Sequence, residues 1–121
     1  SNPVDTSPDV YWEPALYRET GRIVAEWDGI DMMLVSFAGI QAVKRGVQEL
    51  RRQIEAIVDV GKAISKPMAI VLFTAGIAEA ERIVSEVQSE CMEAGFPVYP
   101  TIGRAARAIS NVISYYENRE L

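Results

Sequence analysis

Residues 68–76 of the chain read MAIVLFTAG, and this stretch decides the fold class. Its first six residues, Met68 to Phe73, are apolar without interruption, and a turn with Gly76 follows them. A short apolar run that is bounded by turn residues is typical of a strand buried on both faces, as in a parallel sheet. Because Pro67 disfavours helical backbone in the residue before it, we expect the strand to begin immediately after this proline.

Helical spacing of apolar residues predicts four helices around this strand. The first begins at Pro14, whose missing N–H costs nothing in a first helical turn, and ends at Asp28-Gly29. The third and fourth are centred on residues 80–91 and 105–116. The second is a single long helix after Ala38-Gly39, and its apolar stripe consists of Val43, Val47, Leu50, Ile54, Ile57, Gly61 and Ile64.

Strands and helices therefore alternate along the chain. Further strands are expected at Ile30–Phe37 and Phe96–Tyr99, on either side of the Met68–Phe73 run. This order predicts a three-stranded parallel sheet with helices on both faces, because parallel neighbours need right-handed crossovers. A segment from residues 2 to 10 could extend one edge of the sheet.

Length and composition indicate one domain of ordinary globular type. The chain has 121 residues, of which 49% are hydrophobic, and this is room for one core. We expect residues 1–13 to be irregular, with Ser1 a cloning remnant, and residues 14–121 to form the domain. No apolar run reaches the roughly 18 residues that a membrane span needs, and no basic-then-apolar leader is present.

Charge and residue usage exclude several classes of function. A net charge of −5 argues against a nucleic-acid partner, because proteins that bind nucleic acids normally present a basic surface. The single cysteine, Cys91, excludes an internal disulfide, so we expect a cytoplasmic location. The chain has no histidine, which removes histidine acid–base catalysis, a phosphohistidine, a corrinoid site and most transition-metal sites. Asp31 lies at the wrong end of its strand for a phospho-accepting receiver domain. We predict no catalytic residue and no metal ligand.

The carboxyl ends of the three strands are the place where a ligand is expected in an open parallel sheet. The preferred anion site is Gly39, Ile40, Gln41 and Ala42, at the start of the second helix, where backbone N–H groups are free. Secondary candidates in the other two loops are Thr74, Gly76 and Thr101. The alternative is that these residues make ordinary turns, with Thr101 a helix N-cap.

Other conspicuous side chains have structural explanations. Cys91 lies on an apolar helical stripe and is expected to be an inert core residue. The basic residues of the long helix alternate with acidic ones, which is typical of a solvated face; they are Lys44, Arg45, Arg51 and Arg52. Four aromatic residues could cap the core or form a docking patch: Tyr11, Trp12, Tyr115 and Tyr116.

A succession of short motifs resembles one enzyme family. Asn2-Pro3-Val4-Asp5 resembles the NPxD start of this family, and Trp27–Val35 resembles its acidic turn and the apolar strand that follows. Lys66-Pro67 matches the "KP" that opens the second strand, and Gly95–Tyr99 matches a third strand of the form Gly-x-Pro, then Val or Ile, then Phe or Tyr. Gly103–Ile109 resembles the closing "erAarAl" helix. The family is that of the nucleoside-diphosphate-forming acyl-CoA synthetases, which includes succinyl-CoA synthetase.

The resemblance implies a flavodoxin-like three-layer α/β/α domain that is a fragment of a larger ligase. Such an enzyme joins a carboxylic acid to CoA at the expense of ATP or another NTP, through an acyl phosphate and a phosphohistidine on another domain. CoA, the nucleotide and Mg²⁺ would bind the sister domains, which are a CoA-binding, a histidine-bearing and an ATP-grasp module. This domain would hold no cofactor, and its loop at Gly39–Gln41 would face the acyl substrate or phosphate.

Three hypotheses for function therefore stand side by side. The domain could face substrate and phosphate in an acyl-CoA synthetase. It could be a non-catalytic domain that docks sister domains. It could also be an independent small-ligand binder of flavodoxin type, with Ser36 to Gln41 as a phosphate loop that is poor in hydroxyl groups.

Overall fold

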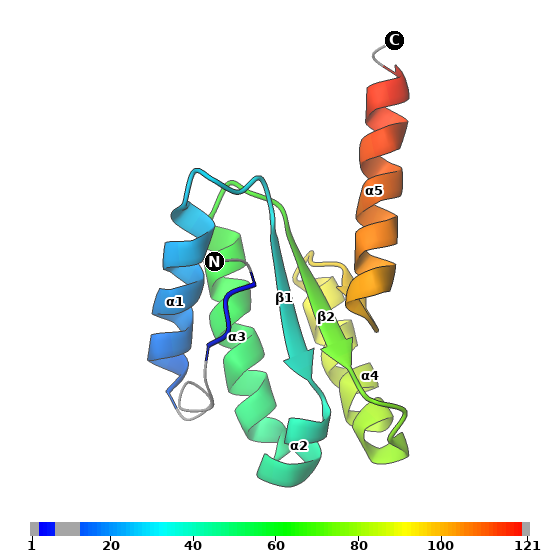
Figure 1. The fold of residues 1–121 in the computed structure, drawn as a ribbon. Helices are drawn as coiled ribbons and strands as arrows, with labels where there is room; N and C mark the ends of the chain where they lie inside the picture. Colours follow the sequence, from blue (N-terminus) through cyan, green and yellow to red (C-terminus); the bar gives the residue numbers. More distant parts are fainter. Residues whose placement is uncertain (1–2, 7–12, 120–121) are drawn as a thin grey trace.

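The computed structural model describes residues 3–6 and 13–119 of the chain. It is a mixed α/β structure with one small sheet (Figure 1). Its elements in chain order are α1 (Pro14–Glu26), β1 (Met33–Ala38), α2 (Ile40–Arg45), α3 (Val47–Ala63), β2 (Met68–Phe73), α4 (Ala78–Glu93), β3 (Val98–Tyr99) and α5 (Ile102–Arg119).

The sheet is parallel throughout, as the sequence predicts. Its three strands lie in the order β1-β2-β3, with Met33 opposite Met68 and Ile70 opposite Val98. Strand β1 begins three residues later than expected, because a turn that closes with Ile30 N–H on the Trp27 carbonyl (3.4 Å) precedes it. Residues 3–6 do not join the sheet, and the rest of the expected edge segment lies outside the described residues.

The expected single helix after β1 is two helices, which corrects the prediction. Gly46 separates α2 from α3 with a φ of +99° and donates its N–H to the Ala42 carbonyl at 2.9 Å. With a ψ of 146°, Gly46 lies in a region of φ/ψ space that is essentially restricted to glycine, and the chain cannot continue as a helix through it. The apolar spacing continues across this break, which is why periodicity alone does not detect it.

The hydrophobic core lies on one face of the sheet. Met33 and Phe37 of β1 and Ile70 and Leu72 of β2 point into it and pack under α1, α3 and α4. Because β1, β2 and β3 are sequential neighbours, two right-handed crossovers carry α3 and α4 to the same side. Helix α1 packs closely on α3, since a Cβ on Gly21 would lie 2.9 Å from the Ile57 Cδ1.

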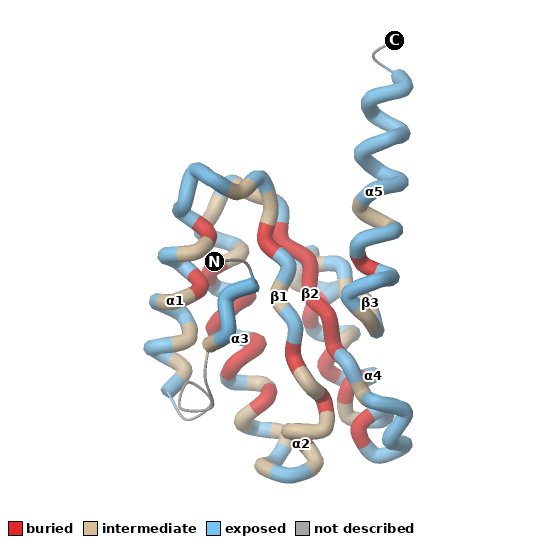
Figure 2. Tube along the Cα trace, viewed as in Figure 1, coloured by how far each residue is buried: buried red, intermediate tan, exposed pale blue. Residues whose placement is uncertain are grey.

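The opposite face of the sheet is only partly covered. Helix α5 contacts β2 and β3, and Ala69 and Val71 of β2 are buried beneath this side. Leu34, Ser36 and Phe73 remain exposed, and Figure 2 shows α5 as exposed along almost its whole length. The expected third layer is thus present only near the start of α5. We call Leu34, Ser36, Ala38 and Phe73 the open face.

Candidate functional site

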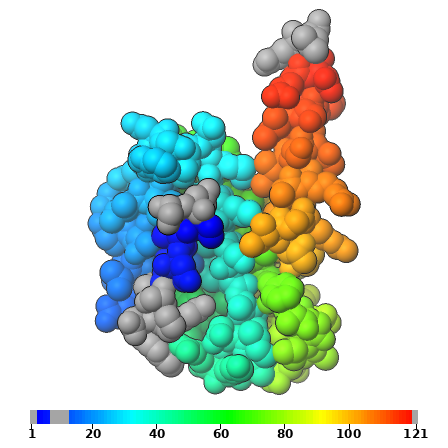
Figure 3. All heavy atoms as spheres, viewed as in Figure 1, coloured from blue at the N-terminus to red at the C-terminus, as the bar shows by residue number. Residues whose placement is uncertain are grey.

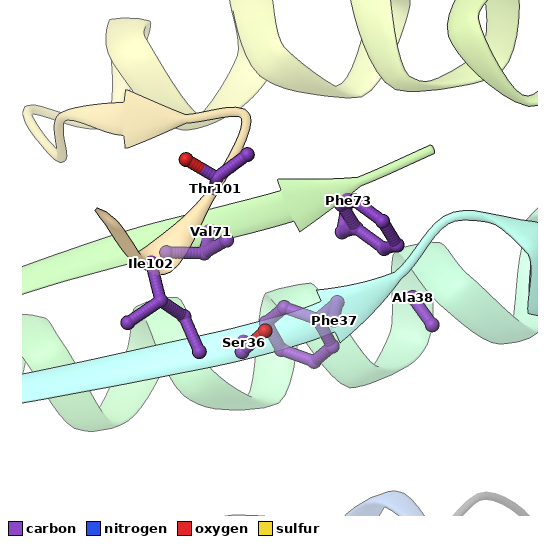
Figure 4. A pocket seen from close by; sticks show the side chains of 7 residues that line it. All are labelled: Ser36, Phe37, Ala38, Val71, Phe73, Thr101 and Ile102. Carbon is purple, nitrogen blue, oxygen red and sulfur yellow. The ribbon is translucent and has the colours of Figure 1, made fainter. Parts of the chain in front are cut away.

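The three loops at the carboxyl ends of the strands come together, as the sequence predicts for a parallel sheet. The Gly39 N–H donates to the Phe73 carbonyl at 2.7 Å, which joins the ends of β1 and β2. A hollow of about 270 Å³ extends from this junction to the start of α5. Figure 4 shows the side chains that line it, which are Ser36, Phe37, Ala38, Val71, Phe73, Thr101 and Ile102.

The lining of the hollow is almost entirely apolar. The hydroxyls of Ser36 and Thr101 are its side-chain polar groups, and no charged side chain of residues 3–6 and 13–119 lines it. The Thr101 Oγ1 accepts the Arg104 N–H at 3.0 Å, so this threonine is the N-cap of α5 that the sequence offered as an alternative. The hollow therefore suits an apolar side chain better than an anion.

The preferred anion loop is built for packing. Gly39 is buried with an ordinary helical φ of −60°, and a Cβ there would lie 2.7 Å from Val84 Cγ2. The Gly39 N–H is already bonded to Phe73, and the Ala42 N–H is bonded to the Gly39 carbonyl at 3.0 Å. Ala42 is buried, whereas Ile40 and Gln41 are half-buried. Helix α2 has six residues, so its dipole is small.

The second loop is a tight turn. Ala75 and Gly76 both have positive φ, of 54° and 73°, and the Gly76 N–H points to the Thr74 Oγ1 at 3.4 Å. Helix α4, which follows, carries Glu79 and Glu81 in its first turn. These carboxylates already complement the helix dipole and would repel an added anion. Thr74 and Gly76 thus have a structural explanation in the turn itself.

Two arginines of α3, away from the hollow, form ion pairs with neighbouring carboxylates. Arg51 bridges α3 and α4 by pairing with Glu86 (3.7 Å) and with Glu90, and Arg52 pairs with Glu49 at 2.7 Å. Burial raises the pKa of the Cys91 thiol to about 11, with a smaller contribution from Glu90, so the thiol is protonated at neutral pH. Within residues 3–6 and 13–119, no cluster of acidic or cysteine side chains could hold a metal ion.

Helix α5 exposes an apolar surface that the pattern of strands and loops does not predict. Helix α5 exposes five large apolar residues and buries only Ala105; the five are Ile102, Val112, Ile113, Tyr115 and Tyr116. The rings of Tyr115 and Tyr116 meet edge to face with centroids 5.5 Å apart. The sequence offered this tyrosine pair as part of a docking patch, whereas Tyr11 and Trp12 lie outside the described residues.

Comparisons with known proteins add no family assignment. No family model, no curated protein and no solved structure matches the chain. A search of the described helices for one long and apolar enough to cross a bilayer also found none.

Proposed function

We propose that this chain is a non-catalytic docking domain of a nucleoside-diphosphate-forming acyl-CoA synthetase, with a flavodoxin-like fold and a cytoplasmic location. The observation that carries the docking role is the open face. Parallel sheets occur almost only with both faces covered, yet here Leu34 is 36% exposed and Phe73 is 47% exposed. Exposed apolar residues that lie together mark a contact surface.

The enzyme class rests on the resemblance of the sequence motifs. The alternation of β1, β2 and β3 with helices agrees with the domain that the resemblance implies. In this proposal CoA, the nucleotide, Mg²⁺ and the phosphohistidine belong to sister domains, and the domain described here contributes surface. The absence of histidine from the chain agrees with this division of labour.

A substrate-facing role is the second candidate, and the meeting of three loops at one edge favours it. It would depend on the half-buried pair Ile40 and Gln41, because the other two residues of the predicted anion loop are buried. The independent small-ligand hypothesis receives less support, since the hollow at this edge is shallow, apolar and without a basic side chain.

Reconstitution of turnover tests the proposal. The chain is mixed with the CoA-binding, histidine-bearing and ATP-grasp modules of a nucleoside-diphosphate-forming acyl-CoA synthetase, and ADP release that depends on acid and CoA is measured. We expect turnover only in the complete mixture. Leu34→Glu should abolish it, because the carboxylate would have to be desolvated in the contact.

A matched control separates docking from general damage. Ser85→Glu adds the same charge to an exposed position on α4, on the helix-covered side, and should leave turnover unchanged. Circular dichroism must show that both variants fold. Full turnover with folded Leu34→Glu would overturn the docking role, and failure of every mixture to turn over would overturn the enzyme assignment.

A further inference from the structure

The apolar residues of α5 follow a heptad pattern. They recur at alternating spacings of three and four, which is the pattern of a helix that packs along another helix. The residues of this seam are Ile102, Ala105, Ile109, Val112 and Tyr116. The positions that flank the seam are also uncharged: Ala106, Ala108, Ile113 and Tyr115. Charged Arg104, Arg107 and Glu117 lie away from it.

Most of this seam has no partner within the described part of the chain. Ala105 is buried and Ile109 is half-buried, but Val112 is 55% exposed and Tyr116 is 60% exposed. Figure 3 shows α5 standing out from the body of the molecule. An apolar stripe on a helix normally faces a core, so the second half of α5 is built to contact something else.

The exposed area is large enough for a specific interface. The large apolar residues of α5 expose on the order of 500 Å² on each copy. Two copies would therefore bury roughly 1,000 Å² in total, which is about the lower limit for a specific interface.

We propose that the partner on this surface is a second copy of the chain, with the two α5 helices packed antiparallel. The first half of the helix is small at the flanking positions, with Ala106 and Ala108, and the second half is large, with Ile113 and Tyr115. Antiparallel pairing sets Ala106 opposite Ile113 and Ala108 opposite Tyr115, so small residues meet large ones on both flanks. Parallel pairing sets Ala108 opposite Ile113 but gives Ala106 and Tyr115 no counterpart within α5. Such a contact is self-complementary and closes as a two-fold dimer.

Sedimentation equilibrium of the full chain tests the dimer. We expect twice the 13.4 kDa chain mass at micromolar concentration. Val112→Glu puts a charge in the seam and should weaken association roughly 100-fold, whereas Ser114→Glu, on the opposite side of the same helix, should not. A monomer at all concentrations, or a dimer that Val112→Glu leaves intact, would overturn the inference.

Disulfide trapping tests the orientation. Chains with Ala106→Cys are mixed with chains carrying Ile113→Cys, and the buried Cys91 should stay silent. Antiparallel helices should give the mixed disulfide. Parallel helices should instead link chains with Ala108→Cys to chains with Ile113→Cys, and that outcome would overturn the antiparallel arrangement. This inference rests on the proposed docking role, and the experiments can refute the dimer and the proposed function independently of each other. A monomer whose Leu34→Glu variant loses turnover refutes the dimer alone, and a dimer without reconstituted turnover refutes the enzyme assignment alone.

Discussion

Substitution of Gly39 is expected to destabilise the domain through packing. A Cβ at this position would lie 2.7 Å from Val84 Cγ2 and 3.2 Å from the Phe73 carbonyl oxygen. The first distance is far below van der Waals contact, and the second atom belongs to the backbone and moves little. Because φ is −60°, no backbone strain adds to this clash. Overpacking of this kind costs about 1–3 kcal/mol, so we expect Gly39→Ala to lower the free energy of unfolding by roughly that amount.

A double-mutant cycle with urea unfolding, followed by circular dichroism, measures this clash. Val84→Ala removes the methyl groups that meet the new Cβ and destabilises the domain by itself, because Val84 is buried. If the clash is real, the double variant should be more stable than the sum of the single effects predicts, by at least about 0.5 kcal/mol. A neutral Gly39→Ala, or strict additivity with Val84→Ala, would refute the packing role of this glycine.

This result also decides how the predicted anion loop can be probed. Loss of activity in a Gly39 variant would follow from lost stability and would say nothing about a ligand. Gln41 is half-buried and has no such clash, so Gln41→Ala is the cleaner probe of the substrate-facing hypothesis.

Further predictions follow from Gly46, from Cys91 and from the absence of histidine. Gly46→Ala should destabilise the domain by about 1–3 kcal/mol in urea, because a φ of +99° with a ψ of 146° is essentially restricted to glycine, although a Cβ there meets nothing within 4 Å. The Cys91 thiol, with its pKa raised to about 11 by burial, should resist alkylation at pH 8 until the chain unfolds. Because the folded state holds this proton more tightly, the free energy of unfolding should fall as pH rises from about 9 to about 11, and Cys91→Ala should lose that dependence. The purified chain, which has no histidine, should remain unlabelled by radioactive ATP or acyl phosphate, and stable incorporation of phosphate would contradict the docking proposal.

The fold was predictable where local patterns and global topology agree. The run at Met68–Phe73 is β2 with the predicted bounds, and Pro14 begins α1. The break at Gly46 was hidden because Val43 and Val47 on either side keep helical spacing. The late start of β1 was hidden because Ile30 continues the apolar run without marking the turn that precedes the strand.

The meeting of the three loops at one edge of the sheet was predictable from the sequence, but the tight packing around Gly39 was not. That three loops meet at one edge follows from parallel topology. That Gly39 is buried depends on Val84, which is distant in the sequence and reaches the loop only after α4 has packed. No local pattern around Gly39 carries this information, because a glycine needed for close packing and one needed for ligand approach look the same.

The open face itself argues for a partner. A sheet face that is exposed to water normally carries polar side chains at every second residue. The six positions of β1 and β2 on this face are Leu34, Ser36, Ala38, Ala69, Val71 and Phe73, and only the serine is polar. Helix α5 repeats the mismatch, since its seam stays apolar at Val112 and Tyr116, beyond the half-buried Ile109. Leu34 and Phe73 of the sheet and the second half of α5 are thus apolar although they are exposed. The apolar runs predict a sheet that is covered on both faces, because apolar side chains are stabilised by removal from water. Where the described chain leaves them exposed, a second molecule can cover them.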